Sequence, residues 1–340
     1  MKQEVIIGRV ASAIPSLVKQ RQPEKILLVT GHHLDIDASF PDLLNALNFP
    51  LQIVHPPDGL LQVNNLPKFE DVQIVIAIGG GKVIDFAKGI VHQSATKPHF
   101  IVAPTTAGSG SEATPFAVLY NGTEKVSLEP PDFLPQSVVL DALLVNQLPA
   151  KQKAISGADA FAQCIEALWN RNANADSDAL ALKGLQGLHG LLPRFVQSTE
   201  EALALQVLKA ANLSGQAISI TRTTGAHALS YYLTAHHHVP HGQAVALFLP
   251  LFFIYNDKPQ AEEKLRKIYD ALDVSDAKEA AETCRRFFSS IGLATNFAEA
   301  GLNGVSISEL LRSVNQQRFA NNPVAFEGAE LETLIRRYLC

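Results

Sequence analysis

The sequence predicts an α/β domain followed by a domain that is almost entirely helical. Over roughly the first 140 residues, short runs rich in Val and Ile alternate with segments of helix length. This alternation is typical of strands that are buried on both faces of a largely parallel sheet. From about Leu148 onward, segments rich in Ala and Leu dominate and β-branched runs become scarce, which indicates helices. We therefore expect one domain over residues 1–146 and a second over residues 147–340.

The expected strands of the first domain share a short length and a content of β-branched residues. They are KILLVTG (25–31), PLQIVH (50–55), VQIVIAIGGG (72–81), HFIVAPT (99–105) and SVVLD (137–141). Pro149 follows the last of them by a few residues and suits the first turn of a helix. We therefore expect the helical domain to begin near this proline.

Length and composition are those of an ordinary soluble protein. The chain has 340 residues, of which 47% are hydrophobic and 18% charged, and a length of this order favours about two domains. The net charge of −5 gives no electrostatic reason to expect nucleic acid or an acidic membrane surface as a partner. Three widely spaced cysteines form no CxxC pair, which argues against a disulfide framework and a thiolate metal site. Because a signal-peptide pattern and a long apolar run are lacking, we expect a cytoplasmic protein without a membrane segment.

Two loops rich in glycine follow predicted strands. GGGKVIDFAK (79–88) leads into a helix, and its glycines would let the backbone approach a pyrophosphate whose charge the helix N-terminus stabilises. Such a turn also serves tight connections that bind nothing, so alone it leaves both interpretations open. PTTAGSGSEATP (104–115) places hydroxyl groups among small residues after another strand. Together the two loops favour a dinucleotide, because ligands of open α/β sheets bind at the carboxyl ends of the strands.

A carboxylate and two histidines from separate helical segments form a candidate metal site. Asp159, Gln163 and Glu166 share one face of a predicted helix, because they are spaced i, i+4, i+7. His227 lies in a later apolar segment, and His241 follows a proline that ends it. A single histidine in such a segment is more often a packed core residue than a ligand. The set with Asp159 favours Zn²⁺ or Fe²⁺, because several titratable groups are costly to bury without a partner.

These motifs together resemble the iron-containing (group III) alcohol dehydrogenases, in a superfamily with glycerol dehydrogenase and dehydroquinate synthase. GGGKVIDFAK is similar to the family's phosphate turn GGGSxxDxAK, and PTTAGSGSE is similar to its PTTAGTGSE loop. SGADAFAQCIE and GAHALSYYL…HG resemble the segments that carry its metal ligands. The resemblance spans most of residues 25 to 250.

The resemblance implies a Rossmann-like N-terminal domain, a helical C-terminal domain, NAD(P)H as cofactor and one divalent metal, Fe²⁺ or Zn²⁺. It implies that Asp159, His227 and His241 are metal ligands. Gln163 stands where the family's alcohol dehydrogenases usually have a fourth ligand, a histidine, and an amide oxygen binds cations more weakly than imidazole. Implied positions at or supporting the pyrophosphate turn and near the cofactor are Gly79, Gly80, Gly81, Asp85, Lys88, Thr105, Thr106 and Ser109.

Two further departures from the family pattern concern the cofactor and the proton path. Gly31 stands where NAD-preferring members commonly have an aspartate, which would bind the ribose 2′-hydroxyl and repel a 2′-phosphate. With His32 and His33 next to this glycine, we expect NADPH to be tolerated. Tyr231 replaces the second histidine of the family's HxxxH, which alters any proton relay through that position.

The expected reaction is reversible hydride transfer between nicotinamide and a small carbonyl compound, with the metal as Lewis acid between His227 and His241. Tyr231 or a water chain would carry the proton. Arg222, flanked by threonines just before His227, suits an anionic substrate, and this combination resembles the phosphonoacetaldehyde reductase branch, which would form 2-hydroxyethylphosphonate. A structural ion pair is the other interpretation of Arg222. A homodimer is common in the family and is compatible with this sequence.

Two alternatives stay open at this point. A dehydroquinate synthase-like cyclase would use NAD transiently, but it would need a glutamate ligand and several basic residues around a phosphorylated sugar, whereas the ligand helix offers Asp159. A non-catalytic cofactor-binding relative would have lost its metal because of Gln163. Cofactor turnover separates the first alternative from a dehydrogenase, and metal analysis separates the second.

Overall fold

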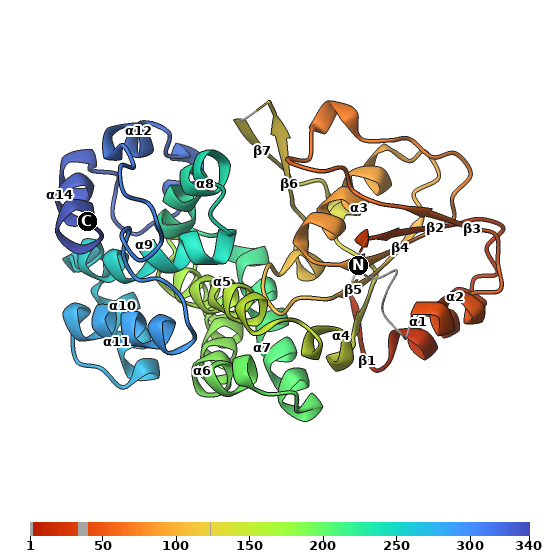
Figure 1. Ribbon diagram of the computed structural model, residues 1–340, viewed down its shortest axis with the longest axis horizontal. Helices are drawn as coiled ribbons and strands as arrows, with labels where there is room; N and C mark the ends of the chain where they lie inside the picture. Colours follow the sequence, from red (N-terminus) through yellow and green to blue (C-terminus); the bar gives the residue numbers. More distant parts are fainter. Residues whose placement is uncertain (1–2, 33–39, 123) are drawn as a thin grey trace. The chain divides into compact units, whose positions relative to one another are not determined.

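The computed structural model describes residues 3–32, 40–122 and 124–340. The chain divides into two compact units (Figure 1). The first comprises Met1–Leu148 with Glu200–Leu208, and the second comprises Pro149–Thr199 with Lys209–Cys340. The sequence-based division at residues 146 and 147 therefore differs by two residues and by the segment 200–208. That segment groups with the first unit, where the Arg9 guanidinium donates to the Glu201 carboxylate at 2.6 Å.

The first unit is built on a six-stranded parallel sheet in the order β1-β8-β5-β4-β2-β3. Its strands are β1 (Glu4–Ile7), β2 (Ile26–Thr30), β3 (Leu51–Val54), β4 (Ile74–Gly79), β5 (His99–Pro104) and β8 (Ser137–Leu140). Its helices are α1 (Val10–Lys19), α2 (Phe40–Ala46), α3 (Gly81–Gln93) and α4 (Ala142–Asn146), and a separate antiparallel pair comprises β6 (Ala117–Asn121) and β7 (Glu124–Leu128). The five expected strands are present, and β1 and the β6–β7 pair are additional.

Helices cover both faces of this sheet, which explains why its central strands are apolar throughout. Alternate residues of β4 point to opposite faces, so that Ile74 and Ile76 pack with α1 and α2 while Val75 and Ala77 pack with α3. The parallel register sets Gly79 opposite Pro104. As a result, the two glycine-rich loops leave the sheet side by side at its carboxyl edge.

The second unit is helical, and the structure assigns no strand within residues 149–340. Its helices are α5 (Ala150–Trp169), α6 (Ala175–Gln197), most of α7 (Glu201–Thr221), α8 (Gly225–His237), α9 (His241–Tyr255), α10 (Glu262–Leu272), α11 (Ala277–Ser290), α12 (Ile307–Arg312), α13 (Gln316–Phe319) and α14 (Gly328–Tyr338). α5 is buried continuously from Gly157 to Trp169 and packs against α6 and α9. α9 is apolar over most of its length, and α5 is buried on every side although one face carries Asp159, Gln163 and Glu166, so both helices lie in the core.

The predicted α/β-plus-all-α architecture is confirmed. Among the described residues, no helix combines the length and the apolar character needed to cross a bilayer.

Acidification should weaken the first unit through His99. Burial and the nearby charge of Arg21 lower the pKa of this imidazole to about 4. The folded protein thus holds His99 neutral while the unfolded chain protonates it near its ordinary pKa of about 6.5. The stabilisation is complete above that pH and is lost as the pH falls toward 4. We expect the free energy of unfolding to fall by about 1–2 kcal/mol through this group, a value reduced for solvent screening because the ring is only half-buried.

Urea unfolding between pH 7 and pH 4 measures this effect. His99→Gln should flatten the pH dependence relative to the unsubstituted protein, and His237→Gln, which removes an exposed imidazole, should leave it unchanged. Parallel curves for all three proteins would contradict the assignment.

Candidate metal and cofactor site

Three helices of the second unit bring together the residues of the predicted metal site. Asp159 lies on α5, His227 on the first turn of α8, and His241 at the start of α9. α8 ends where His238 adopts a left-handed conformation with φ of 55°, and Pro240 precedes α9. The chain therefore reverses within a few residues, which returns His241 to His227. One potential ligand atom from each of Asp159, His227 and His241 lies within 4.8 Å of the others.

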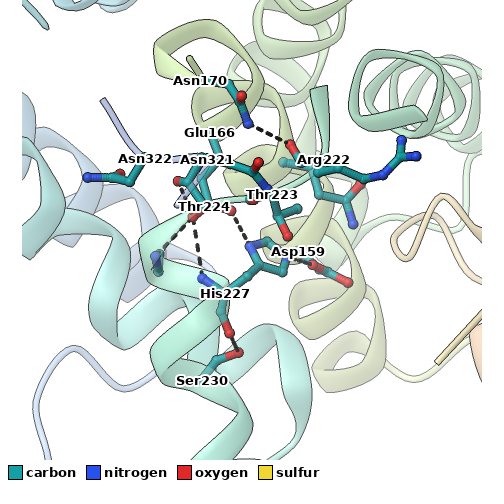
Figure 2. A network of polar contacts seen from close by, with 12 residues as sticks. Asp159, Glu166, Asn170, Arg222, Thr223, Thr224, His227, Ser230, Asn321 and Asn322 are labelled. Carbon is teal, nitrogen blue, oxygen red and sulfur yellow. Dashed lines mark hydrogen bonds and ion pairs between the residues drawn. The ribbon is translucent and has the colours of Figure 1, made fainter. Parts of the chain in front are cut away.

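His227 lies between two buried carboxylates (Figure 2). Its Nε2 is 3.1 Å from Asp159 Oδ1, and its Nδ1 hydrogen-bonds Glu166 Oε2. Burial alone would lower the pKa of His227, but the charge of Glu166 and the hydrogen bonds to both carboxylates outweigh it and raise the pKa to about 10. Burial alone would likewise raise the pKa of each carboxyl, but the interactions with His227 lower it in both. Without a metal ion, therefore, a protonated imidazole balances two carboxylates.

The direction of the hydrogen bonds at Glu166 follows from its neighbours. Trp169 Nε1 donates to Thr224 Oγ1 at 2.8 Å, and an indole nitrogen can only donate. The Thr224 hydroxyl proton therefore goes to Glu166 Oε1, also at 2.8 Å, and the Ala226 amide donates to the same oxygen at 2.9 Å. Glu166 is thus an ionised acceptor that keeps a proton on His227 Nδ1. Nε2 is then the nitrogen that can bind a metal ion, an arrangement typical of metal-ligating histidines.

Glu166 is the important residue that the sequence did not identify. Its position on the same helix face as Asp159 was recognised, and the spacing i, i+7 was the only signal that could have assigned it a role. Its side chain is fully buried, whereas Asp159 is 6% exposed.

Gln163 lies beside Asp159 but is held by two neighbours. Its Oε1 accepts a hydrogen bond from Ser214 Oγ at 2.9 Å. Its amide hydrogen-bonds the Asp159 carboxylate, which contributes to the lowered pKa of that group. In this orientation the amide nitrogen faces Asp159, so the expected ligation through the oxygen stays a prediction.

Aromatic side chains surround His241. The ring centroids of His227 and His241 are 5.3 Å apart at 64°, and the Tyr231 ring lies 5.9 Å from that of His241 and almost parallel to it, at 9°. Tyr231 and His241 are partly exposed, in contrast to His227. The three residues predicted to take part in catalysis therefore lie together.

Two glycines allow α8 and α9 to pack closely against their neighbours, which brings the predicted ligands together. A Cβ on Gly242 would lie 2.0 Å from the backbone oxygen of Ile155 on α5, and a Cβ on Gly225 would lie 2.0 Å from a ring carbon of Phe252. Gly242 directly follows His241, so the close approach of α9 to α5 fixes the position of the His241 backbone. One carboxylate and two imidazoles at this spacing suit a divalent cation such as Fe²⁺ or Zn²⁺.

The predicted cofactor residues of the first unit converge at the carboxyl edge of the sheet. The Thr105 amide donates to the Gly79 carbonyl at 3.0 Å. A Cβ on Gly80 would meet Thr106 at 3.4 Å, and a Cβ on Gly81 would meet Ser109 at 2.9 Å. Gly31 directly follows β2, which pairs with β4. The neighbouring His33 lies outside the described residues.

Lys88 and Asp85 lie behind these loops. The Lys88 ammonium lies 2.7–3.3 Å from Ser111 Oγ, Thr114 O, Thr114 Oγ1 and Phe116 O, which accept its three N–H groups, and the side chain is fully buried. Asp85 accepts from the Ser111 hydroxyl and the Val118 amide. This arrangement suits support of the pyrophosphate turn, one of the two roles expected for these residues, and their part in cofactor binding stays a prediction.

Arg222 has a backbone role that the sequence did not show. It adopts a left-handed conformation with φ of 70° after α7, and its carbonyl accepts from Asn170 Nδ2 at 3.1 Å. Its guanidinium donates to the Ser219 carbonyl at 2.6 Å, and the side chain extends away from His227 (Figure 2). The expected contact with substrate therefore stays a prediction.

Family models match both parts of the chain. Residues 2–142 match the iron-containing alcohol dehydrogenase model, and residues 153–339 match that of the Fe-containing alcohol dehydrogenase family, C-terminal. The chain belongs to the iron-containing alcohol dehydrogenase family. The resemblance predicted from the motifs is thereby confirmed.

Individual members of the iron-containing alcohol dehydrogenase family are distant relatives of the chain. The probable alcohol dehydrogenase EutG of Salmonella typhimurium is 30% identical over 248 residues, which cover 67% of this chain and 62% of that protein. The match therefore spans less than two thirds of that relative. Phosphonoacetaldehyde reductase of Streptomyces viridochromogenes is 29% identical over 293 residues, 74% of each chain.

Solved structures share the fold of the chain. The alcohol dehydrogenase from Oenococcus oeni matches with a TM-score of 0.89 at 19% identity, covering 99% of this chain and 98% of that one. Sulfoacetaldehyde reductase from Bifidobacterium kashiwanohense in complex with NAD⁺ matches with a TM-score of 0.86 at 24% identity, covering 99% and 96%.

Replacing Glu166 by Gln should weaken metal binding without changing the size of the side chain. The amide cannot accept all the hydrogen bonds that the carboxylate accepts, so His227 loses the partner that fixes its tautomer. We expect Zn²⁺ affinity to fall about 10- to 100-fold, measured by competition with a chromophoric chelator. Glu263→Gln, at a side chain that is 91% exposed, is the matched control and should bind normally. Equal affinities for the two variants would show that Glu166 has no such role.

Gly242→Ala should displace His241. The new methyl group would overlap the Ile155 carbonyl, so α9 must move away from α5. We expect a loss of about 1–3 kcal/mol in stability and at least a tenfold loss of Zn²⁺ affinity. Gly190→Ala on α6, where a Cβ meets no atom within 4 Å, should leave Zn²⁺ affinity unchanged and should not destabilise the protein, because Ala favours a helix more than Gly does. Thermal unfolding and the same chelator competition measure both, and unaltered zinc binding by Gly242→Ala would contradict the packing argument.

Proposed function

We propose that this protein is a metal-dependent, NAD(P)-linked alcohol dehydrogenase that acts on a small aldehyde or the corresponding alcohol. The single observation that carries the proposal is the convergence of Asp159, His227 and His241 within 4.8 Å in a chain of this family. The glycine-rich loops that meet at the carboxyl edge of the sheet support the nicotinamide cofactor. Fe²⁺ or Zn²⁺ is the proposed metal.

When bound, the divalent cation supplies Lewis-acid polarisation of the carbonyl, and the nicotinamide cofactor supplies or accepts the hydride. Asp159, His227 and His241 would hold the cation. Glu166 prepares His227 by keeping its Nδ1 protonated. We assign proton exchange with the product hydroxyl to Tyr231, because its ring stacks on that of His241 one turn after His227.

The carboxyl ends of β2 and β3 bear on the choice between NADH and NADPH. His32, which follows Gly31, stacks on His55 with ring centroids 4.1 Å apart at 28°. His55 donates through Nδ1 to the Thr30 carbonyl at 2.8 Å, which fixes the ring at the strand end. The ribose of a dinucleotide is commonly recognised at the end of the second strand of such a sheet. The imidazoles of His32 and His55 lie at this strand end, and Gly31 contributes no acidic side chain that would repel a phosphate. Both features support acceptance of the 2′-phosphate of NADPH.

An anionic substrate is the narrower form of the proposal. Phosphonoacetaldehyde reductase is among the relatives, but so are proteins named for long-chain alcohols and for 1-propanol. Within this chain the proposal depends on Arg222, the cation nearest in sequence to His227. If Arg222 binds substrate, Arg222→Ala should raise the KM for phosphonoacetaldehyde much more than the KM for propionaldehyde. Equal effects would limit Arg222 to its backbone role.

The deciding experiment follows the oxidation of NADPH and NADH by chelator-treated protein to which Fe²⁺, Zn²⁺ or no metal is returned. Neutral and anionic small aldehydes are compared as substrates. We expect stoichiometric, metal-dependent cofactor oxidation with at least one aldehyde. A cyclase would consume no cofactor, and a non-catalytic protein would show no turnover with any metal.

His55→Ala should weaken NADPH binding more than NADH binding, and the same loss for both would refute 2′-phosphate recognition.

A further inference from the structure

A buried serine on α7 contacts the far side of the Gln163 amide. Ser214 is fully buried, and its hydroxyl oxygen lies 2.9 Å from Gln163 Oε1 and 2.7 Å from the Ala211 carbonyl oxygen. Gln163 is itself only 2% exposed, and the other side of its amide hydrogen-bonds Asp159. The amide thus lies between Ser214 and a residue of the proposed metal site.

The hydroxyl of Ser214 cannot satisfy both neighbouring oxygen atoms. It carries one proton, whereas the Gln163 and Ala211 oxygen atoms are both acceptors. The Ala211 carbonyl is the closer of the two, and a serine within a helix commonly donates to a carbonyl one turn earlier. When Ser214 donates to Ala211, its own oxygen still accepts. The amide nitrogen of Gln163 is then the better partner for Ser214, which requires the amide to be turned by half a revolution.

The charge beside Asp159 decides between the two amide orientations. Without a cation, the amide N–H faces the ionised Asp159 carboxylate, because two oxygen acceptors placed together would lack a proton between them. A divalent cation bound at Asp159 would attract the amide oxygen of Gln163 and repel its amide N–H group. The nitrogen and oxygen of the amide occupy nearly the same volume, so the exchange needs no repacking.

We propose that Gln163 supplies an oxygen ligand to the cation by reversing its amide, and that Ser214 is the positioning residue which accepts the released N–H. The inference rests on the proposed metal-dependent function. It gives a ligand set of two oxygen and two nitrogen atoms from Asp159, Gln163, His227 and His241. Oxygen ligands favour harder cations than imidazole does. The affinity for Mn²⁺ relative to Zn²⁺ should therefore be higher with Gln163 than in a site with a third histidine.

Binding of Co²⁺, Zn²⁺ and Mn²⁺ to the whole protein tests the proposal independently of activity. Affinity is measured by chelator competition, and the visible absorption of bound Co²⁺ reports the ligand set. Gln163→Leu should lower Co²⁺ affinity about 10- to 100-fold and change the absorption spectrum, since a ligand is lost. Gln163→His should raise the preference for Zn²⁺ over Mn²⁺ at least tenfold.

Ser214→Ala isolates the positioning role. It should lower Co²⁺ affinity about five- to tenfold, a smaller effect than that of Gln163→Leu. Ser230→Ala is the matched control, because this serine is equally buried and donates to a carbonyl one turn earlier, that of His227. The control should retain the affinity of the unsubstituted protein.

Each result is decisive. If Gln163→Leu binds Co²⁺ with unchanged affinity and spectrum, Gln163 is not a ligand and the inference is overturned, while the proposed function stands. If only Ser214→Ala is without effect, the positioning role is overturned. If Ser214→Ala does not fold, the Gln163 variants still decide the ligation. If the unsubstituted protein binds none of the three cations, the proposed metal-dependent function fails as well.

Discussion

The buried carboxylate of Glu166 is the constraint on which the geometry of the proposed metal site depends. An ionised group without exposure to water is stable only if polar partners replace its hydration. Here Thr224, the backbone of Ala226 and His227 provide those partners at the start of α8. The same bonds fix the position of α8 against α5, the tautomer of His227 and the direction of its Nε2, which faces Asp159. A requirement of protein stability thus also sets the orientation of a proposed metal ligand.

Close backbone packing complements this charged interaction. Gly225 and Gly242 lie in the first turns of α8 and α9, where a Cβ would overlap Phe252 or the Ile155 carbonyl. Because each glycine is within two residues of a proposed ligand, the contacts that bury the helices also set the spacing of the imidazoles. The hydrophobic effect presses these helices together, and the absence of two side chains determines how near they come.

The sequence predicted what local patterns determine and missed what depends on distant partners. β4 was predicted from its continuous apolar run, which is typical of a strand buried on both faces. β1 has only four residues, and this short stretch did not stand out although three of them are apolar. Asp159, His227 and His241 followed from residue type and spacing. The enclosure of Lys88 by residues 23–28 positions away and the hold of Ser214 on Gln163 from 51 positions away could not follow, because no periodicity encodes them. The backbone role of Arg222 was missed for the same reason.

A common device supports both ligand ends of the chain. In the first unit, the buried Lys88 ammonium holds the 111–116 segment through hydroxyl and carbonyl oxygens, and burial lowers its pKa to about 8 although Asp85 and Glu112 oppose this. In the second unit, the buried Glu166 carboxylate holds the start of α8 through hydroxyl and amide groups. A buried charge is costly unless every partner is in place, so it tolerates few alternative arrangements. In each unit, therefore, a buried charge fixes the segment that carries proposed ligand-binding residues.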